Sequence, residues 1–302
     1  SDLARYEVMD GQQRLNAIKE LLSGDFSLRG LTVLSALNGR RYTKLPPRIK
    51  RSLDRASVQA IIVLQESQTS LKKAGSHRFY ELRRFVFERL NTGGRRLNAQ
   101  EIRNAVYGSR FNNLVIELAR GAVFTRIWGI PAFQVADPSE YYENPERQKN
   151  TLYRTMGDCQ IVLRFFALRD ATHIQGSIRR ILDNCMERNL DLDAEQCAAL
   201  GVAFTERLEF LDALFDGAPF EAVLYGRKRP LVSIFDGMMV AIDRLWAPKD
   251  ELAAKKRKIQ KAYDVLLAKE GSTGRLTGSA NTSQDIKDRI DLFERMFARE
   301  LD

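Results

Sequence analysis

Near the start of the chain, five consecutive residues have the types that bind a phosphate: Asp10-Gly11-Gln12-Gln13-Arg14. The residues before them predict a short strand at 6–9. The residues after them predict a helix at 15–22, with Leu15, Ile18 and Leu22 on one face. Free N–H groups at a helix start attract anions, and an arginine in the first turn adds a forked cation. The junction therefore suits a phosphate, although a simple polar turn capped by its aspartate has the same composition.

Hydrolysis of a nucleotide needs cations on the phosphates, usually a magnesium ion, and a group that orients the attacking water. Gly11 would let the phosphates approach the backbone closely, and Arg14 would pair with their oxygens. Gln12 or Gln13 would position the water, while Asp10 would act as a base or hold magnesium through water. We predict Asp10, Gln12, Gln13 and Arg14 as the catalytic residues.

A second polar stretch, residues 87–105, joins two predicted helices through a glycine loop. Asn98 and Glu101 have the spacing of a capping box, so a helix should start at Asn98. Beside Gly11 and Arg14, the predicted nucleotide-binding residues are Asn91, Thr92, Gly93, Gly94, Arg103 and Asn104. Glu88 or Glu101 would complete a magnesium shell with Asp10, since hard cations prefer oxygen ligands. A helix stop at the two glycines and a helix cap at the second glutamate explain these residues equally well.

Together these stretches resemble one family of proteins. The residues that carry the resemblance are Asp10-Gly11-Gln12-Gln13-Arg14, then Phe87-Glu88-Arg89-Leu90-Asn91-Thr92-Gly93-Gly94, then Leu97-Asn98 with Glu101-Ile102-Arg103-Asn104-Ala105. They are similar to the N-terminal, ParB-like domain of GmrSD-type modification-dependent restriction proteins. The phosphorothioate-sensing SspE defence proteins carry the same domain. The resemblance is strong over residues 5–107 and continues weakly to residue 166.

The resemblance implies that the first motif serves nucleotide hydrolysis and that DNA is the target of a defence reaction. The second motif also resembles the Glu-Asn…Leu…Glu segment of ParB proteins, which helps to hold nucleotide phosphates and magnesium. In addition, the family has a strand and a helix before the first motif, so we expect a segment upstream of this sequence. GmrSD-type proteins cut DNA through a second domain with a His-Asn-His type metal site. His77 and His173 cannot supply that site, so a nuclease domain or subunit is expected elsewhere.

The predicted fold class is α+β, with a small ParB-like mixed sheet-and-helix domain at 1–107 and an all-helical domain at 108–302. Asn38-Gly39, between residues 31–37 and 40–45, predicts a β-hairpin with a type I′ turn. Pro46-Pro47 then opens a helix. Further helices are predicted at about residues 111–119, 150–169, 174–188, 193–215, 230–245, 249–269 and 284–301.

The charge pattern favours a polyanionic partner, because 48 Lys and Arg residues against 39 Asp and Glu residues give a net charge of +9. Seven basic residues lie within positions 40–55, against the single acid Asp54. We predict DNA binding by Arg40, Arg41, Arg48, Arg51 and Arg55. Residues 255–261 hold a second basic cluster. A solvated helix face is the alternative for both clusters.

Three cysteines, Cys159, Cys185 and Cys197, are an odd number without metal-site spacing, which predicts reduced core thiols in a cytoplasmic protein. The longest apolar run, residues 60–64, is too short to cross a membrane. No signal peptide is visible.

The function that these features predict is an NTP-hydrolysing component, a GTPase or ATPase, of a bacterial restriction or antiphage system. It would sense DNA, modified or not, and pass the signal to a partner nuclease, with a homo-oligomer as a further option. Two alternatives stay open: a non-catalytic ParB-like nucleotide switch that binds DNA, and a ParB-like nuclease.

Overall fold

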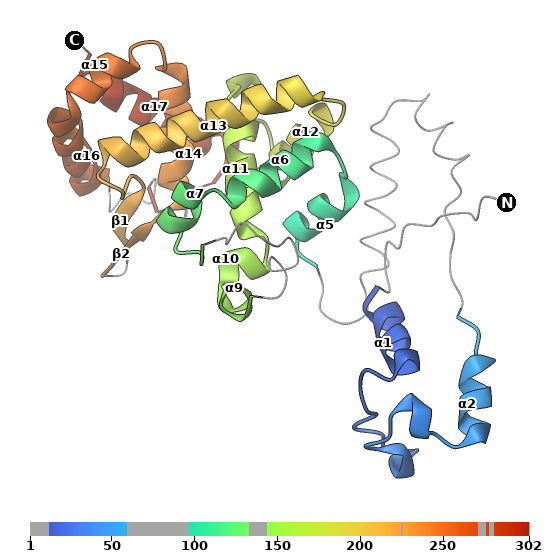
Figure 1. Ribbon diagram of the computed structural model, residues 1–302. Helices are drawn as coiled ribbons and strands as arrows, with labels where there is room; N and C mark the ends of the chain where they lie inside the picture. Colours follow the sequence, from blue (N-terminus) through green and yellow to red (C-terminus); the bar gives the residue numbers. More distant parts are fainter. Residues whose placement is uncertain are drawn as a thin grey trace. The chain divides into compact units, whose positions relative to one another are not determined.

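The computed structural model describes residues 12–58, 97–132, 144–224, 226–270, 276–277 and 281–301. The chain divides into two compact units, Ser1–Arg96 and Leu97–Asp302 (Figure 1).

The described part of the first unit consists of short helices. These are α1 (Gln12–Ser23), the 3₁₀ helices η1 (Ser35–Leu37) and η2 (Tyr42–Lys44), and α2 (Pro47–Asp54). The helices predicted after the first motif and after Pro46 are confirmed. Pro47 occupies the first position of α2, where a proline costs no hydrogen bond. The strand predicted at residues 6–9 lies outside the described residues, so the ParB-like arrangement stays a prediction.

The predicted hairpin at Asn38-Gly39 is wrong. A type I′ turn requires positive φ at both central residues, but Asn38 has φ −58° and ψ 137°, and only Gly39 has a positive φ, of 80°. These angles, with the 3.1 Å bond from the Arg40 N–H to the Leu37 carbonyl, are those of a type II turn, which splays flanking strands. The Asn38 side chain also bonds both the N–H and the carbonyl of Leu31, at 3.0 Å each. The flanking segments therefore form 3₁₀ turns.

The second unit is mostly helical. Its helices are α5 (Ala99–Val106), α6 (Arg110–Ala119), α7 (Ala122–Ile127), α9 (Pro145–Lys149), α10 (Thr151–Arg154), α11 (Gly157–Leu168), η3 (Ala171–His173), α12 (Ile178–Arg188), α13 (Ala194–Leu214), α14 (Val232–Arg244), α15 (Lys249–Ala254), α16 (Lys256–Glu270) and α17 (Ser283–Ala298). The helices predicted from residue 111 onward are confirmed, with ends shifted by a few residues and two of them divided. None of the helices that the structure describes has both the length and the apolar character of a membrane span.

A short antiparallel hairpin corrects the prediction of an all-helical second domain. Its strands are β1 (Glu221–Leu224) and β2 (Arg227–Pro230). Leu224 pairs with Arg227, so the connection has two residues, and Gly226 supplies the positive φ of 72° that such a tight connection needs. The fold class is therefore mixed α and β with most of the mass in helices.

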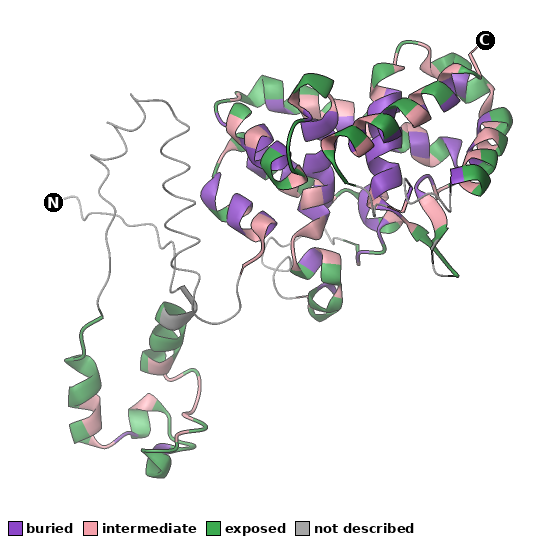
Figure 2. Cartoon of the chain, turned by 180° about the vertical axis from the view of Figure 1, so that it is seen from behind, coloured by how far each residue is buried: buried purple, intermediate pink, exposed green. Residues whose placement is uncertain are grey.

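Helices α11 and α14 form the centre of the second unit, and Figure 2 shows their buried faces in purple. All residues of α14 from Ser233 to Ile242 are buried. The aromatic rings of both helices pack edge to face against neighbouring rings: the ring centroids of Phe165 in α11 and Phe204 in α13 lie 5.5 Å apart, and those of Phe235 in α14 and Phe220 before β1 lie 5.1 Å apart. The three cysteines are free and buried, as predicted.

Helix α14 approaches α17 closely because Gly237 has no side chain. A Cβ atom at Gly237 would lie 2.3 Å from Cδ2 and 2.8 Å from Cε2 of Phe293. Since the Phe293 ring is fully buried, it has little room to move away.

We expect Gly237→Ala to destabilise the chain by about 1–3 kcal/mol through overpacking, even though alanine is the better helix former. Urea denaturation followed by circular dichroism measures the change. The control is Gly201→Ala in α13, where the new Cβ would meet only the movable Cδ1 of Leu114, at 3.1 Å. This control should be neutral or stabilising. Equal stability of the two variants would contradict the close-packing argument.

Candidate functional site

The first motif lies at the start of α1. The helix begins at Gln12, so the backbone of Gln12, Gln13 and Arg14 forms its first turn. The first N–H groups of a helix have no partner within it, and no acidic residue occupies this turn. The helix end is therefore suited to an anion. Asp10 and Gly11 lie outside the described residues, as do the three side chains of the turn, and the catalytic assignment stays a prediction.

The second motif is described only from Leu97 onward, which leaves Glu88, Asn91, Thr92, Gly93 and Gly94 outside the described residues. The predicted capping box at the start of α5 is confirmed.

In this capping box, Asn98 Oδ1 accepts bonds from the N–H groups of Gln100 at 2.8 Å and Glu101 at 3.1 Å. In return, Glu101 Oε2 accepts a 2.6 Å bond from the Asn98 N–H. The Glu101 carboxylate therefore caps α5. This is the alternative that the sequence left open beside a role in a magnesium shell. Among the described residues, no three His, Cys, Asp or Glu side chains gather into a metal site.

Arg103 is held inside the second unit. Its side chain is buried, and its Nε donates a 2.7 Å bond to Asp183 Oδ1. Its two terminal nitrogens donate to Gln100 Oε1 and to the Arg179 carbonyl, at 3.1 Å each. Two of these bonds, to Asp183 and to the Arg179 carbonyl, join α5 to α12. This geometry gives Arg103 a structural role, and we leave it out of the nucleotide site proposed below.

Asn104 is half-buried on the same helix. Its Nδ2 lies 3.1 Å from Met156 Sδ, and its Oδ1 accepts a 2.9 Å bond from Gln100 Nε2. Met156 ends the turn that precedes α11, and Asp158 follows in the first turn of that helix, where burial raises the pKa of its carboxyl to about 6. Asn98 Nδ2 donates a further 2.8 Å bond to the Thr155 carbonyl of the turn before α11. The polar residues of α5 thus anchor it to the turn that precedes α11.

The predicted DNA-binding arginines of α2 lie on the surface. Arg48, Arg51 and Arg55 are exposed, and their spacing of three and four places them on one helical face. Arg55 continues the helical path as the C-cap, with φ −98° and ψ −3°. Lys50 is engaged elsewhere, because its Nζ donates a 2.7 Å bond to the Thr43 carbonyl. The face therefore presents three cations without the neighbouring lysine.

The other two predicted DNA-binding arginines, Arg40 and Arg41, are also exposed. Arg41 Nη1 donates a 3.0 Å bond to the carbonyl of Gly24, just after α1. It also lines a cavity of about 520 Å³ together with Asp25, Phe26, Ser27 and Arg29. The Arg41 side chain is therefore hydrogen-bonded to the backbone just after α1. The DNA contacts of all five arginines stay predictions.

The C-terminal basic cluster is partly used for internal contacts. Lys255 Nζ donates a 3.0 Å bond to the Leu301 carbonyl, and Lys256 Nζ lies 2.6 Å from Asp216 Oδ1. The hydrogen bond from Lys256 holds the pKa of the Asp216 carboxyl below its usual value. Of the predicted cluster, Arg257, Lys258 and Lys261 are exposed.

Strand β2 contains a basic run that our sequence analysis missed. Arg227, Lys228 and Arg229 are consecutive and exposed. Lys228 pairs with Glu221 across the hairpin, at 3.0 Å. The signal in the sequence was a run of three basic residues directly after a glycine.

The comparisons with known proteins concern the first third of the chain. Residues 1–108 match the family model described as GmrSD restriction endonuclease, N-terminal domain. No curated protein and no solved structure matches the chain. The matched range includes both motifs and also α5, which packs within the second compact unit.

Proposed function

We propose, taking residues 1–108 as a GmrSD-type N-terminal domain, that this chain is a nucleotide-hydrolysing, DNA-sensing component of a restriction or antiphage defence system. The observation that carries the proposal is the family match over the range that holds both polar motifs. It supports a restriction function and an interaction with DNA. Nucleotide turnover and the partner nuclease are the finer parts of the proposal, and they rest on the chemistry of the motifs.

In the proposed nucleotide site, the first turn of α1 presents its N–H groups and Arg14 to the phosphates. Gln12 and Gln13 would orient the attacking water, and Asp10 would take its proton. Residues 91–94 would close the other side of the phosphates. The carboxylates of Asp10 and Glu88 supply the oxygen ligands that magnesium prefers. A bound magnesium ion would neutralise charge on the phosphates.

In the proposed DNA-sensing step, phosphates of the DNA backbone bind the exposed cations of α2. DNA binding would then change the rate of nucleotide turnover, and a separate nuclease domain or subunit would respond.

Release of inorganic phosphate from GTP, ATP and CTP with magnesium, with and without modified DNA, tests the proposal. We expect turnover of at least one nucleotide and a change of rate with DNA. Tight binding of a nucleotide without turnover would favour the nucleotide switch. Nicking of a plasmid by the purified chain would favour the ParB-like nuclease. If the chain neither binds nor hydrolyses any of the three nucleotides, the nucleotide has no part in its function.

The DNA-binding face gives a separate prediction. Replacing Arg48, Arg51 and Arg55 by Gln should weaken DNA binding and reduce the slope of log affinity against log salt by about two to three, because each neutralised phosphate contributes about 0.9. Fluorescence anisotropy across a salt series measures this slope. NTP hydrolysis in the absence of DNA should be unchanged.

A matched control removes the same charge elsewhere. Lys149, Arg154 and Arg180 are exposed cations of the second unit, and their replacement by Gln should leave the slope nearly unchanged. If both triple variants behave like the parent, the arginines of α2 only face solvent. In that case the cations of β2 become the next DNA-binding candidates.

A further inference from the structure

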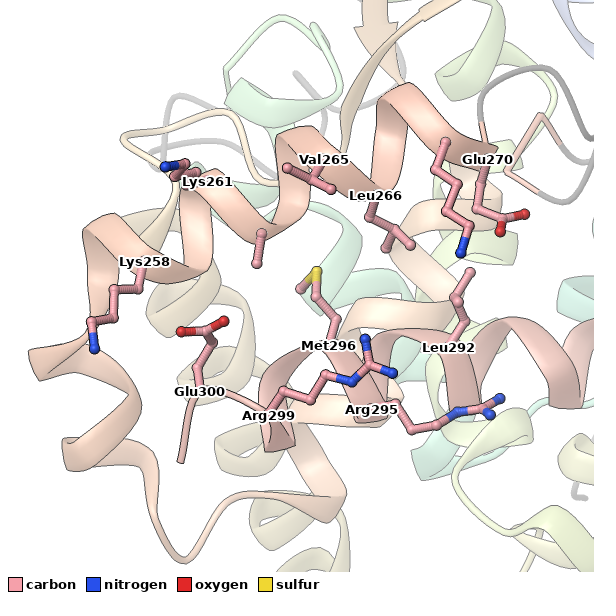
Figure 3. A pocket seen from close by; sticks show the side chains of 12 residues that line it. Lys258, Lys261, Val265, Leu266, Glu270, Leu292, Arg295, Met296, Arg299 and Glu300 are labelled. Carbon is pink, nitrogen blue, oxygen red and sulfur yellow. The ribbon is translucent and has the colours of Figure 1, made fainter. Parts of the chain in front are cut away.

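A groove runs between α16 and α17, with a volume of about 690 Å³. Figure 3 shows Leu266 from α16 and Met296 from α17 pointing into the space between the two helices. Ala262, Val265 and Leu292 add to this apolar lining. Val265 is 60% exposed. The groove thus has an accessible apolar floor.

Basic side chains surround this floor. Lys258 and Lys261 of α16, Arg295 of α17 and its C-cap Arg299 are labelled in Figure 3, and Lys269 of α16 also lines the groove. Two acids, Glu270 and Glu300, also line the groove, so five cations against two anions leave an excess of three positive charges. The ion pairs of the described residues do not include the three lysines or Arg299. Their charges are therefore available to a ligand.

We propose that this groove docks an acidic, amphipathic helix of a partner protein. The lining residues of α16 from Lys258 to Lys269 recur at helical spacing and extend over twelve residues, a rise of about 16 Å or three turns. A partner helix of similar length would place apolar side chains at every third and fourth position on the floor. Its flanking Asp and Glu side chains would then meet the lysines and arginines of both edges.

Two features favour such a helix over a nucleic acid. The cations are separated by apolar side chains, of which Val265 is exposed and Leu266 and Leu292 are half-buried, and a phosphate backbone does not use such side chains. Glu270 and Glu300 lie within the groove, where they would repel phosphates. In addition, the bond from Lys255 to the Leu301 carbonyl holds the end of α17 against the start of α16, so the groove is largely formed before a partner arrives. The inference goes beyond the proposed function and does not depend on nucleotide turnover.

The test uses the full chain and a synthetic, fluorescein-labelled peptide of 18 residues. Its Leu residues follow the i, i+3, i+4, i+7 pattern, and Glu occupies most other positions. A peptide of identical composition in scrambled order has the same charge without the apolar face. We expect the patterned peptide to bind with a Kd below about 100 μM and the scrambled peptide to bind at least tenfold more weakly. Fluorescence anisotropy measures both.

Variants then locate the binding to the groove. Val265→Asp should weaken peptide binding at least tenfold, and Lys261→Glu about fivefold. Their controls are Val202→Asp, at a valine of α13 that is 57% exposed, and Arg257→Glu, at an exposed arginine of α16 outside the groove lining. Both controls should keep the parent affinity.

Other results would overturn the inference. These are the absence of saturable binding, equal affinity for the scrambled peptide, or groove variants that behave like their controls. Displacement of the peptide by duplex DNA, together with loss of DNA binding in Lys261→Glu, would instead make the groove a nucleic-acid surface.

Discussion

Arg14→Ala should lower the rate of NTP hydrolysis about a hundredfold, because removing one preorganised charged group from a site of phosphoryl transfer commonly costs that much. Arg14 lies in the first turn of α1. In the proposed site its guanidinium and the free N–H groups of the helix start would act on the same phosphate. Asp10→Ala should have a comparable effect through loss of the base. Phosphate release at saturating nucleotide and magnesium measures both rates.

Arg51→Ala is the control for this pair. It removes an exposed arginine of the same unit and should leave turnover in the absence of DNA at the parent value. All variants should keep the parent circular dichroism spectrum. Parent-like turnover by Arg14→Ala and Asp10→Ala would contradict the catalytic assignment of the first motif and would leave the polar turn as its explanation.

Asp236→Ala should lower the free energy of unfolding by about 3–5 kcal/mol, the usual cost of breaking a buried ion pair. Asp236 is fully buried in α14 and accepts bonds from Arg164 Nε at 2.8 Å and 3.1 Å, with a further bond from Nη2. Arg289 of α17 lies 4.0 Å from the same carboxylate. The alanine variant would leave the buried Arg164 without its carboxylate partner and would remove a negative charge from beside Arg289. Urea denaturation of the full chain measures the loss.

Asp291→Ala provides the matched control for this stability prediction. Asp291 pairs with Arg244 at 3.3 Å, but its side chain is 53% exposed, and exposed pairs contribute at most about 1 kcal/mol. A loss in Asp236→Ala no larger than in this control would show that water or rearrangement compensates the buried arginines.

Local signals in the sequence were sufficient for most of the helices. The capping box of Asn98 and Glu101 and the helical spacing of apolar residues both act within one or two turns, so they can be predicted without the fold. The 21-residue helix α13, predicted at 193–215, was found at Ala194–Leu214 for this reason.

The failures came from interactions that such local patterns do not contain. Asn38 favoured a hairpin by residue type, but its side chain bonds the backbone of Leu31 and its φ is negative. The hairpin of β1 and β2 was missed because four-residue strands carry too few alternations to be recognised. The bond from Arg103 to Asp183 was not foreseen because the two residues lie 80 positions apart in sequence.

Helix α5 belongs to the matched family range by sequence and to the second compact unit by packing. A fragment cut after residue 108 would therefore take Ile102, Val106 and Tyr107 away from the core that buries them and would separate Arg103 from Asp183. The range that matches the family model and the compact unit that packing defines thus end at different places. Transfer of this domain between proteins must supply a matching surface for α5, which ties the N-terminal domain to the helices that follow it.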